Sequence, residues 1–277
     1  MTVLIDATEL ADLRRTGAAV VVLDVRWRLG GPSGREAYRA GHVPGAVFVD
    51  LDRELAAPPS PQEGRHPLPA IADLQAAARR WGLTGEELVV AYDDDRDLAA
   101  SRAWWLLRWA GLEDVRLLDG GLAAWAAAGG ELEPGDVTPE PGTVTLSPGH
   151  LPTIAIDEVP AAAAHGVLLD ARAAERYRGE IEPIDPQAGH VPGAVSAPTT
   201  GNLDADGRFL PPDALRERFR TVGVDGTRPV AVYCGSGVTA AHQIAALALA
   251  GVDAALYPGS WSQWSADETR PVAVGEG

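Results

Sequence analysis

The chain has 277 residues, of which 46% are hydrophobic and 22% charged, an ordinary composition for two globular domains of average size. With 23 basic and 39 acidic residues, the net charge is −16, which argues against a nucleic-acid backbone or an anionic membrane as the main partner. Every residue of the Lys and Arg class is arginine. The lack of lysine excludes a Schiff-base lysine, and with it pyridoxal-phosphate chemistry, and a P-loop.

The only cysteine is Cys234, which excludes an internal disulfide and any metal site that needs several thiolates. The sequence implies no metal and no organic cofactor. Its first residues lack the basic start and apolar run of a signal peptide, and no apolar stretch reaches about 18 residues. We therefore expect a cytoplasmic protein with no membrane partner.

The expected elements alternate between strand and helix along the chain. Nearly continuous apolar runs predict strands at 18–25, 87–92, 115–119, 168–170 and 230–233. Helical composition is found at 73–82, 100–112 and 240–252. Because such strands are typical of sheets buried on both faces, the fold class expected is α/β, with a mostly parallel sheet flanked by helices in each half.

The second half of the chain repeats the first. VLDVR at 22–26 returns as LLDAR at 168–172, and GHVPGAV occurs at both 41–47 and 189–195. The strand VVAY, the Ala-rich helix after it and a Gly-rich turn into a tryptophan recur in the same order. We therefore expect two homologous domains, at 1–130 and 151–277, joined by a Pro- and Gly-rich linker at 131–150.

Cys234 is the first residue after the expected strand 230–233. Two glycines, Gly235 and Gly237, allow a tightly curled backbone, and a helix is expected to begin at Thr239. Backbone N–H groups in such a turn point inward at a helix N-terminus, where they stabilise anions. A thiol there favours its nucleophilic thiolate form, and a persulfide on Cys234 is stabilised in the same way.

The first half offers an internal comparison. Its corresponding loop, YDDDRDLAAS, has Asp93 where the second half has Cys234, so it contains no sulfur nucleophile. The acidic residues lack the Gly position of an EF-hand loop. We expect a solvated or interdomain-bonded loop and a non-catalytic first domain.

Taken together, the duplicated LD-x-R and GHVPGA motifs, the tandem layout and one Cys loop resemble the two-domain sulfurtransferases of the rhodanese family. CGSGVTA is similar to the loop of the family's 3-mercaptopyruvate sulfurtransferases; its thiosulfate-specific members typically have Arg-Lys in place of Gly235-Ser236. The resemblance implies transfer of a sulfane sulfur from 3-mercaptopyruvate or thiosulfate, through a Cys234 persulfide, to cyanide, a thiol or a thioredoxin-like protein.

The resemblance also assigns site residues. Cys234 and Ser236 are expected to be catalytic. Donor binding is expected from residues near the loop and after the second LD-x-R motif, namely Arg176, Arg178, Gly235, Gly237, Val238 and Thr239. An arginine forms a bidentate hydrogen bond with a carboxylate or sulfonate, which suits an anionic donor. The insertion at 180–190 lacks the arginine common in the mercaptopyruvate enzymes, and Arg208 is a candidate to compensate.

Residues that occur in both halves are interpreted as structural. Asp24, Arg26, Asp170 and Arg172 suit strand-end ion pairs, and His42 and His190 suit turn or interdomain packing. The tryptophans on helical stretches suit core and interdomain packing.

Two alternatives to a small-molecule sulfurtransferase remain. A Cys-dependent phosphatase or arsenate reductase needs an arginine six residues after the cysteine, where this chain has Ala240, and a wider loop. A sulfur-relay protein, which passes a persulfide to a protein partner, would have the same sequence features.

Overall fold

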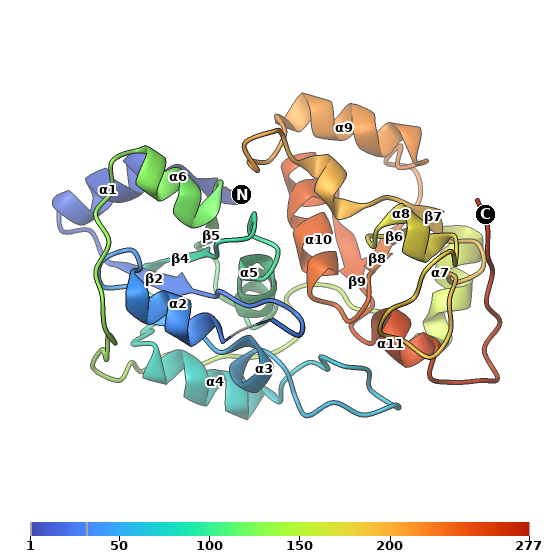
Figure 1. Ribbon diagram of the computed structural model, residues 1–277, viewed down its shortest axis with the longest axis horizontal. Helices are drawn as coiled ribbons and strands as arrows, with labels where there is room; N and C mark the ends of the chain where they lie inside the picture. Colours follow the sequence, from blue (N-terminus) through green and yellow to red (C-terminus); the bar gives the residue numbers. More distant parts are fainter. Residues whose placement is uncertain (1, 32, 277) are drawn as a thin grey trace. The chain divides into compact units, whose positions relative to one another are not determined.

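The computed structural model describes residues 2–31 and 33–276 and divides into two compact units. Unit 1 comprises Met1–Ala57, Pro69–His150 and Asp206–Arg208; unit 2 comprises Pro58–Leu68, Leu151–Ala205 and Phe209–Gly277. Figure 1 shows both along the chain, unit 1 mostly blue to green and unit 2 mostly yellow to red.

Unit 1 is built on a parallel sheet with the strand order β1-β5-β4-β2-β3. Its strands are β1 (Leu4–Ile5), β2 (Val20–Asp24), β3 (Val47–Phe48), β4 (Leu88–Tyr92) and β5 (Val115–Leu118). Its helices are α1 (Ala7–Arg15), α2 (Gly34–Ala40), α3 (Leu51–Glu54), α4 (Ile71–Arg80), α5 (Ala100–Trp109) and α6 (Gly121–Ala127). The central strands β2 and β4 pair in register from Val20↔Leu88 to Asp24↔Tyr92, so their carboxyl ends lie at one edge.

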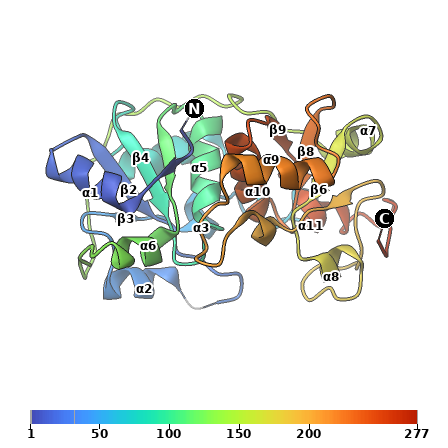
Figure 2. The ribbon, with the colours of Figure 1, turned by 90° about the horizontal axis from the view of Figure 1, so that it is seen from above.

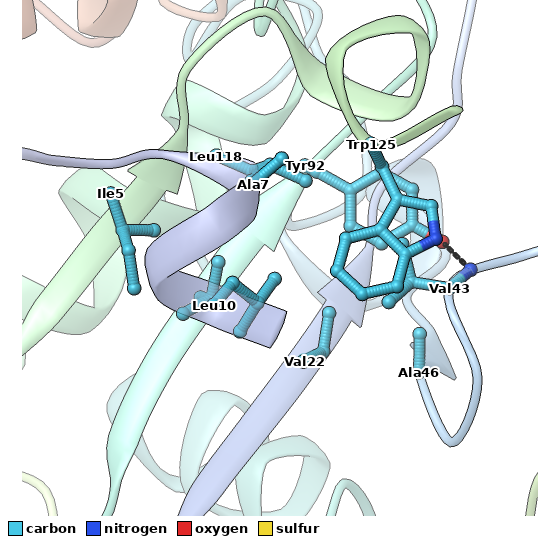
Figure 3. Close-up of a cluster of buried hydrophobic side chains, with 10 residues drawn as sticks. Ile5, Ala7, Leu10, Val22, Val43, Ala46, Tyr92, Leu118 and Trp125 are labelled. Atoms are coloured by element: carbon cyan, nitrogen blue, oxygen red, sulfur yellow. Dashed lines mark hydrogen bonds between the residues drawn. The ribbon is translucent and has the colours of Figure 1, made fainter. Parts of the chain in front are cut away.

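Helices cover both faces of this sheet. In Figure 1, α1 and α6 lie on one face and α4 on the other, and α5 is buried along its whole length. Figure 3 shows the cluster beneath α1 and α6, where Leu10 and Trp125 meet side chains of β2 and β4. The hydroxyl of Tyr92 in this cluster accepts a hydrogen bond from the N–H of Val43 (3.0 Å). The apolar runs of the strands are thus explained by burial on two sides.

Unit 2 has a parallel sheet with the strand order β7-β6-β8-β9. The strands are β6 (Val167–Asp170), β7 (Val195–Ser196), β8 (Val230–Tyr233) and β9 (Ala254–Leu256). The helices are η1 (Ile156–Glu158), α7 (Val159–His165), α8 (Ala174–Tyr177), η2 (Thr199–Asn202), α9 (Pro212–Thr221), α10 (Thr239–Leu249) and α11 (Ser260–Trp264). Figure 2 shows α9 beside α10 within this unit. The expected α/β class with parallel sheets is confirmed in both units.

The duplicated motifs form the same buried contacts twice. Arg26 binds Asp24 (2.7 Å) and donates to the carbonyl of Gly41 (2.9 Å). Arg172 binds Asp170 (2.7 Å) and donates to the carbonyl of Gly189 (2.6 Å). Each arginine therefore ties the end of a central strand to the Gly-His-Val-Pro turn, and the expected strand-end ion pairs are confirmed.

The repeated histidines are structural in the same sense. His42 stacks on Tyr38 at 4.0 Å between ring centroids, and His190 stacks on Tyr177 at 3.7 Å. Both imidazoles are fully buried, and each Nδ1 lies within hydrogen-bond distance of the carbonyl of its tyrosine. These contacts within each unit support the expected turn packing.

The expected linker at 131–150 is fastened along unit 1. Its backbone N–H groups bond to unit 1 carbonyls, as at Gly142 to Arg79 (2.7 Å), Val144 to Leu83 (3.0 Å) and His150 to Trp109 (3.0 Å). Val144 is also buried, together with Leu146. The segment is held by isolated backbone hydrogen bonds and not by a regular helix or strand, so it has no periodic sequence pattern that could have predicted these contacts.

The segment Pro58–Leu68 was expected to belong to the first domain, 1–130, but it belongs to unit 2. It lies in the first half of the sequence, yet its contacts place it in unit 2. Ser60 and Gly64 form a bridge that closes a small loop within the segment. Unit 2 is therefore assembled from separated stretches of the chain. No helix among the described residues is long and apolar enough to cross a membrane.

Candidate functional site

Cys234 lies at the carboxyl end of β8, in the turn that leads into α10. The N–H of Gly237 donates to its Sγ at 3.1 Å, and Gly237 has a positive φ of 78°, which a residue with a side chain adopts only with strain. The cysteine is 2% exposed. The turn thus directs a backbone donor at the sulfur, where negative charge is stabilised, close to the N-terminus of an 11-residue helix.

The start of α11 supports this turn from beside it. Ser260 Oγ accepts the N–H of Cys234 (3.1 Å), while the N–H groups of Trp261 and Ser262 donate to the carbonyls of Cys234 (2.9 Å) and Gly235 (2.8 Å). Ser260 has φ 52°, an unusual conformation for a residue with a side chain. The backbone of the Cys234 loop is therefore held by three hydrogen bonds from one short element.

The segment Pro58–Leu68 is fixed against the same element. The N–H of Arg65 donates to Ser262 Oγ (3.1 Å), and Gln263 Nε2 donates to the carbonyl of Gln62. Gly64 has φ 90°, and a Cβ there would lie 2.7 Å from the carbonyl oxygen of Gly259. Only glycine allows this approach, which presents the next two side chains, Arg65 and His66, to the Cys234 loop.

Ser236 and His66 form a buried polar pair. His66 Nδ1 lies 2.7 Å from Ser236 Oγ, and each residue is 6% exposed. Ser236 is two residues from Cys234. A hydroxyl linked to an imidazole can move a proton at this position, as in general acid–base catalysis.

Arg176 joins a chain of ion pairs at the same loop. Its Nη2 contacts Glu182 Oε1 (2.6 Å) and Asp185 Oδ2 (3.1 Å), and Glu182 also contacts Arg172 (3.4 Å). Asp185 in turn pairs with Arg65. The chain continues from the buried LD-x-R motif to the segment Pro58–Leu68.

The other predicted residues fall into two groups. Gly235 and Val238 are buried in the loop and Thr239 is half-buried where α10 begins. Arg178 instead binds Glu180 with two nitrogens (2.8 and 2.9 Å), in an exposed position. Arg208 belongs to unit 1, where its side chain covers Gly120. Arg176 thus lies beside the Cys234 loop, whereas Arg178 is held by Glu180 and Arg208 belongs to unit 1.

The corresponding loop of unit 1 carries its own anion. The carboxylate of Asp93 accepts the backbone N–H groups of Asp95, Asp97, Ala99 and Ala100 at 2.7–2.9 Å. Burial raises the pKa of Asp93 to about 6, although these four donors act in the opposite direction. The expectation of a solvated loop was wrong for Asp93 and Asp97, both of which are buried.

Sequence reasoning missed Arg65, His66 and Asp185. The signal that could have directed attention to Arg65 is the repeat itself, because Gly64-Arg65 precedes a Leu-Pro step and a helix just as Gly207-Arg208 does in the second half. Asp185 was considered only as part of an insertion without arginine.

Comparison with known proteins agrees with this geometry. The rhodanese-like domain family matches residues 6–128 and again 155–267. A Mycobacterium tuberculosis protein with the provisional name thiosulfate sulfurtransferase SseB is 50% identical over 279 residues, which cover 99% of this chain and 97% of the relative. A Pseudomonas aeruginosa protein, provisionally named 3-mercaptopyruvate sulfurtransferase, is 49% identical over 99% of this chain and 98% of its own.

A solved structure gives the same result. The crystal structure of SseA from Escherichia coli, described as having the rhodanese fold of the 3-mercaptopyruvate enzymes, aligns with a TM-score of 0.84 at 33% identity. The alignment covers 95% of this chain and all of SseA. The chain belongs to the rhodanese family. The predicted tandem of rhodanese-like domains and the predicted sulfurtransferase activity are confirmed.

Proposed function

We propose that this protein is a 3-mercaptopyruvate sulfurtransferase in which Cys234 carries the transferred sulfur. The observation that carries the proposal is the Ser236–His66 pair, 2.7 Å apart and two residues from the nucleophile. It sits beside a cysteine whose Sγ receives a backbone hydrogen bond and near the guanidinium of Arg176.

The first step forms a persulfide. The Cys234 thiolate attacks the sulfur of the donor, an S–S bond forms and the donor's C–S bond breaks. The bonding electron pair remains on carbon as the enolate of pyruvate. Ser236 delivers a proton to that carbon and recovers one from His66 Nδ1, so pyruvate leaves and Cys234–S–SH remains, its outer sulfur keeping the donor's thiol proton. His66 regains its proton from water or from the acceptor thiol before the next turnover.

The second step regenerates the Cys234 thiolate. A thiolate or cyanide attacks the outer sulfur, and the electron pair of the S–S bond returns to Cys234. The product is an acceptor persulfide or thiocyanate. The backbone donors around the loop stabilise the Cys234 thiolate again as it leaves.

The proton requirement separates the two candidate donors. Thiosulfate releases sulfite, a stable anion that needs no proton, whereas 3-mercaptopyruvate releases an enolate that does. A buried proton-donating pair therefore favours 3-mercaptopyruvate. Arg176, which lies beside the loop, binds the carboxylate of that donor.

The acceptor and the compartment follow from the same chemistry. We assign a small thiol, cyanide or a thioredoxin-like protein as acceptor, and the cytoplasm as the site of the reaction, because its reducing conditions keep a lone Cys234 available. The alternative is a relay protein that delivers the persulfide only to a protein partner. Good turnover with small acceptors argues for the enzyme.

The test is sulfur transfer to cyanide with 3-mercaptopyruvate and thiosulfate at equal concentration. We expect faster turnover with 3-mercaptopyruvate; faster turnover with thiosulfate contradicts the donor assignment. Cys234→Ser should abolish turnover while the fold survives. Arg176→Ala should raise the KM for 3-mercaptopyruvate, and the matched control Arg178→Ala should leave it unchanged. An unchanged KM in Arg176→Ala contradicts the role of Arg176.

A further inference from the structure

Arg65 and Arg176 come from distant parts of the sequence and share one carboxylate. Asp185 binds Arg65 Nη1 through Oδ1 and Arg176 Nη2 through Oδ2 (3.1 Å). Two guanidinium groups placed together repel one another, and a carboxylate between them offsets that repulsion. Asp185 thus holds the two cations side by side.

The remaining terminal nitrogens of both arginines lie toward the Cys234 loop. A Cβ placed on Gly235 would be 3.0 Å from Arg65 Nη2 and 3.6 Å from Arg176 Nη1. These nitrogens are not the ones bound to Asp185. Both nitrogens therefore lie close to one point at Gly235, the residue after Cys234, where the two oxygens of a carboxylate could each accept from one arginine.

The side chains around Arg65 and Arg176 preorganise the two guanidinium groups. The side chains of Asp185 and Glu182 are 3% and 4% exposed, whereas Arg176 and Arg65 are 16% and 23% exposed. The side chains of the acidic partners are thus more deeply buried than those of the arginines. Burial raises the pKa of Asp185, with Arg65 acting in the opposite direction. Little reorganisation is needed to receive an anion at the arginines.

We propose that Arg65 is a second donor-binding residue, which forms with Arg176 a clamp for the donor's carboxylate, and that Asp185 positions the clamp. This deepens the proposed function and rests on it. Arg65 supplies, from the segment Pro58–Leu68, the cation that the insertion 180–190 lacks. Gly235 leaves the space over the loop that the Arg65 guanidinium and the bound carboxylate share.

The experiment compares two donors that differ only in the group the clamp binds. They are 3-mercaptopyruvate and mercaptoacetone, in which a methyl group replaces the carboxylate. For Arg65→Gln we expect kcat/KM with 3-mercaptopyruvate to fall roughly 10- to 100-fold, the range for loss of one charge-assisted hydrogen bond. With mercaptoacetone the change should be less than about threefold. Asp185→Asn should raise KM for 3-mercaptopyruvate by a smaller factor and leave kcat unchanged.

Two controls make the result decisive. Arg178→Gln, an arginine of the same region paired with Glu180, should alter neither donor. Formation of one persulfide per Cys234 is followed by mass spectrometry in a single turnover, which tests the proposed function separately. If the wild-type protein forms no persulfide with 3-mercaptopyruvate, the proposed function fails.

If the persulfide forms but Arg65→Gln slows both donors equally, or slows neither, the clamp is refuted while the proposed function stands. An equal loss would mean that Arg65 only supports the loop. Arg65→Lys distinguishes charge from geometry, and under the proposal it recovers part of the lost kcat/KM with 3-mercaptopyruvate only.

Discussion

Replacing Ser236 with alanine separates proton delivery from sulfur transfer. The variant removes the hydroxyl 2.7 Å from His66 Nδ1 and leaves the Cys234 sulfur and its Gly237 hydrogen bond in place. General acid catalysis contributes roughly 10²- to 10⁴-fold, so we expect kcat with 3-mercaptopyruvate to fall about 100-fold, equivalent to about 2.7 kcal/mol in the barrier. With thiosulfate, whose leaving group needs no proton, kcat should change less than about threefold.

The assay measures thiocyanate with each donor at saturating cyanide, and pyruvate with 3-mercaptopyruvate. Thermal unfolding provides the control, because loss of one hydrogen bond should cost only about 1 kcal/mol of stability. An equal loss of kcat with both donors in a normally folded variant would refute the reasoning. Ser236 would then shape the loop rather than move a proton.

Four further variants test other parts of the structure. Gly64→Ala forces a Cβ against the carbonyl of Gly259 at a positive φ, so activity with 3-mercaptopyruvate should fall at least tenfold and docking of the segment should weaken by about 2 kcal/mol; unchanged proteolysis of the segment and unchanged activity would contradict this. Asp97→Asn should stabilise the protein, and this gain should grow as the pH rises above 3.8, the usual pKa of an aspartate. Burial and the nearby Asp93 carboxylate raise the pKa of Asp97 above its usual 3.8, so the folded state binds this proton more tightly than the unfolded chain does. The wild-type protein therefore loses stability when Asp97 is deprotonated, and the variant does not. Parallel pH profiles of melting temperature for the wild type and Asp97→Asn would contradict this explanation. Arg172→Gln and Arg26→Gln should each lower the free energy of unfolding by about 3–5 kcal/mol, because each leaves a buried aspartate without its arginine. Only Arg172→Gln also releases Glu182, so only this variant should raise the KM for the donor. Equal KM values in the two variants would argue against a link between Glu182 and donor binding.

The elements that position the nucleophile were predictable because local pattern and burial agree. The strand 230–233 is apolar because helices cover both faces, and the glycines after Cys234 mark the turn into α10. The internal repeat then distinguished the loop with Cys234 from the loop with Asp93. The sequence alone was enough for the fold and for Cys234 and Arg176 as candidate site residues.

The partners of the nucleophile depend on contacts that have no local pattern. His66 and Arg65 lie in a loop without periodicity, and their positions are set by the close approach of Gly64 to Gly259 and by a bond to Ser262. A hydrogen bond across 170 residues leaves no spacing that could be recognised. The burial of Asp93 was missed for a similar reason, because its four donors come from the fold of its own loop.

The segment Pro58–Leu68 makes the catalytic unit discontinuous in sequence. The chain leaves unit 1 after Ala57, contributes Arg65 and His66 to unit 2, and returns at Pro69. A truncation that begins at 151 would keep Cys234 but lose both of these side chains. Although one domain family matches both halves of the chain, the halves are not interchangeable modules, and any design that separates or exchanges them must carry this loop with the C-terminal half.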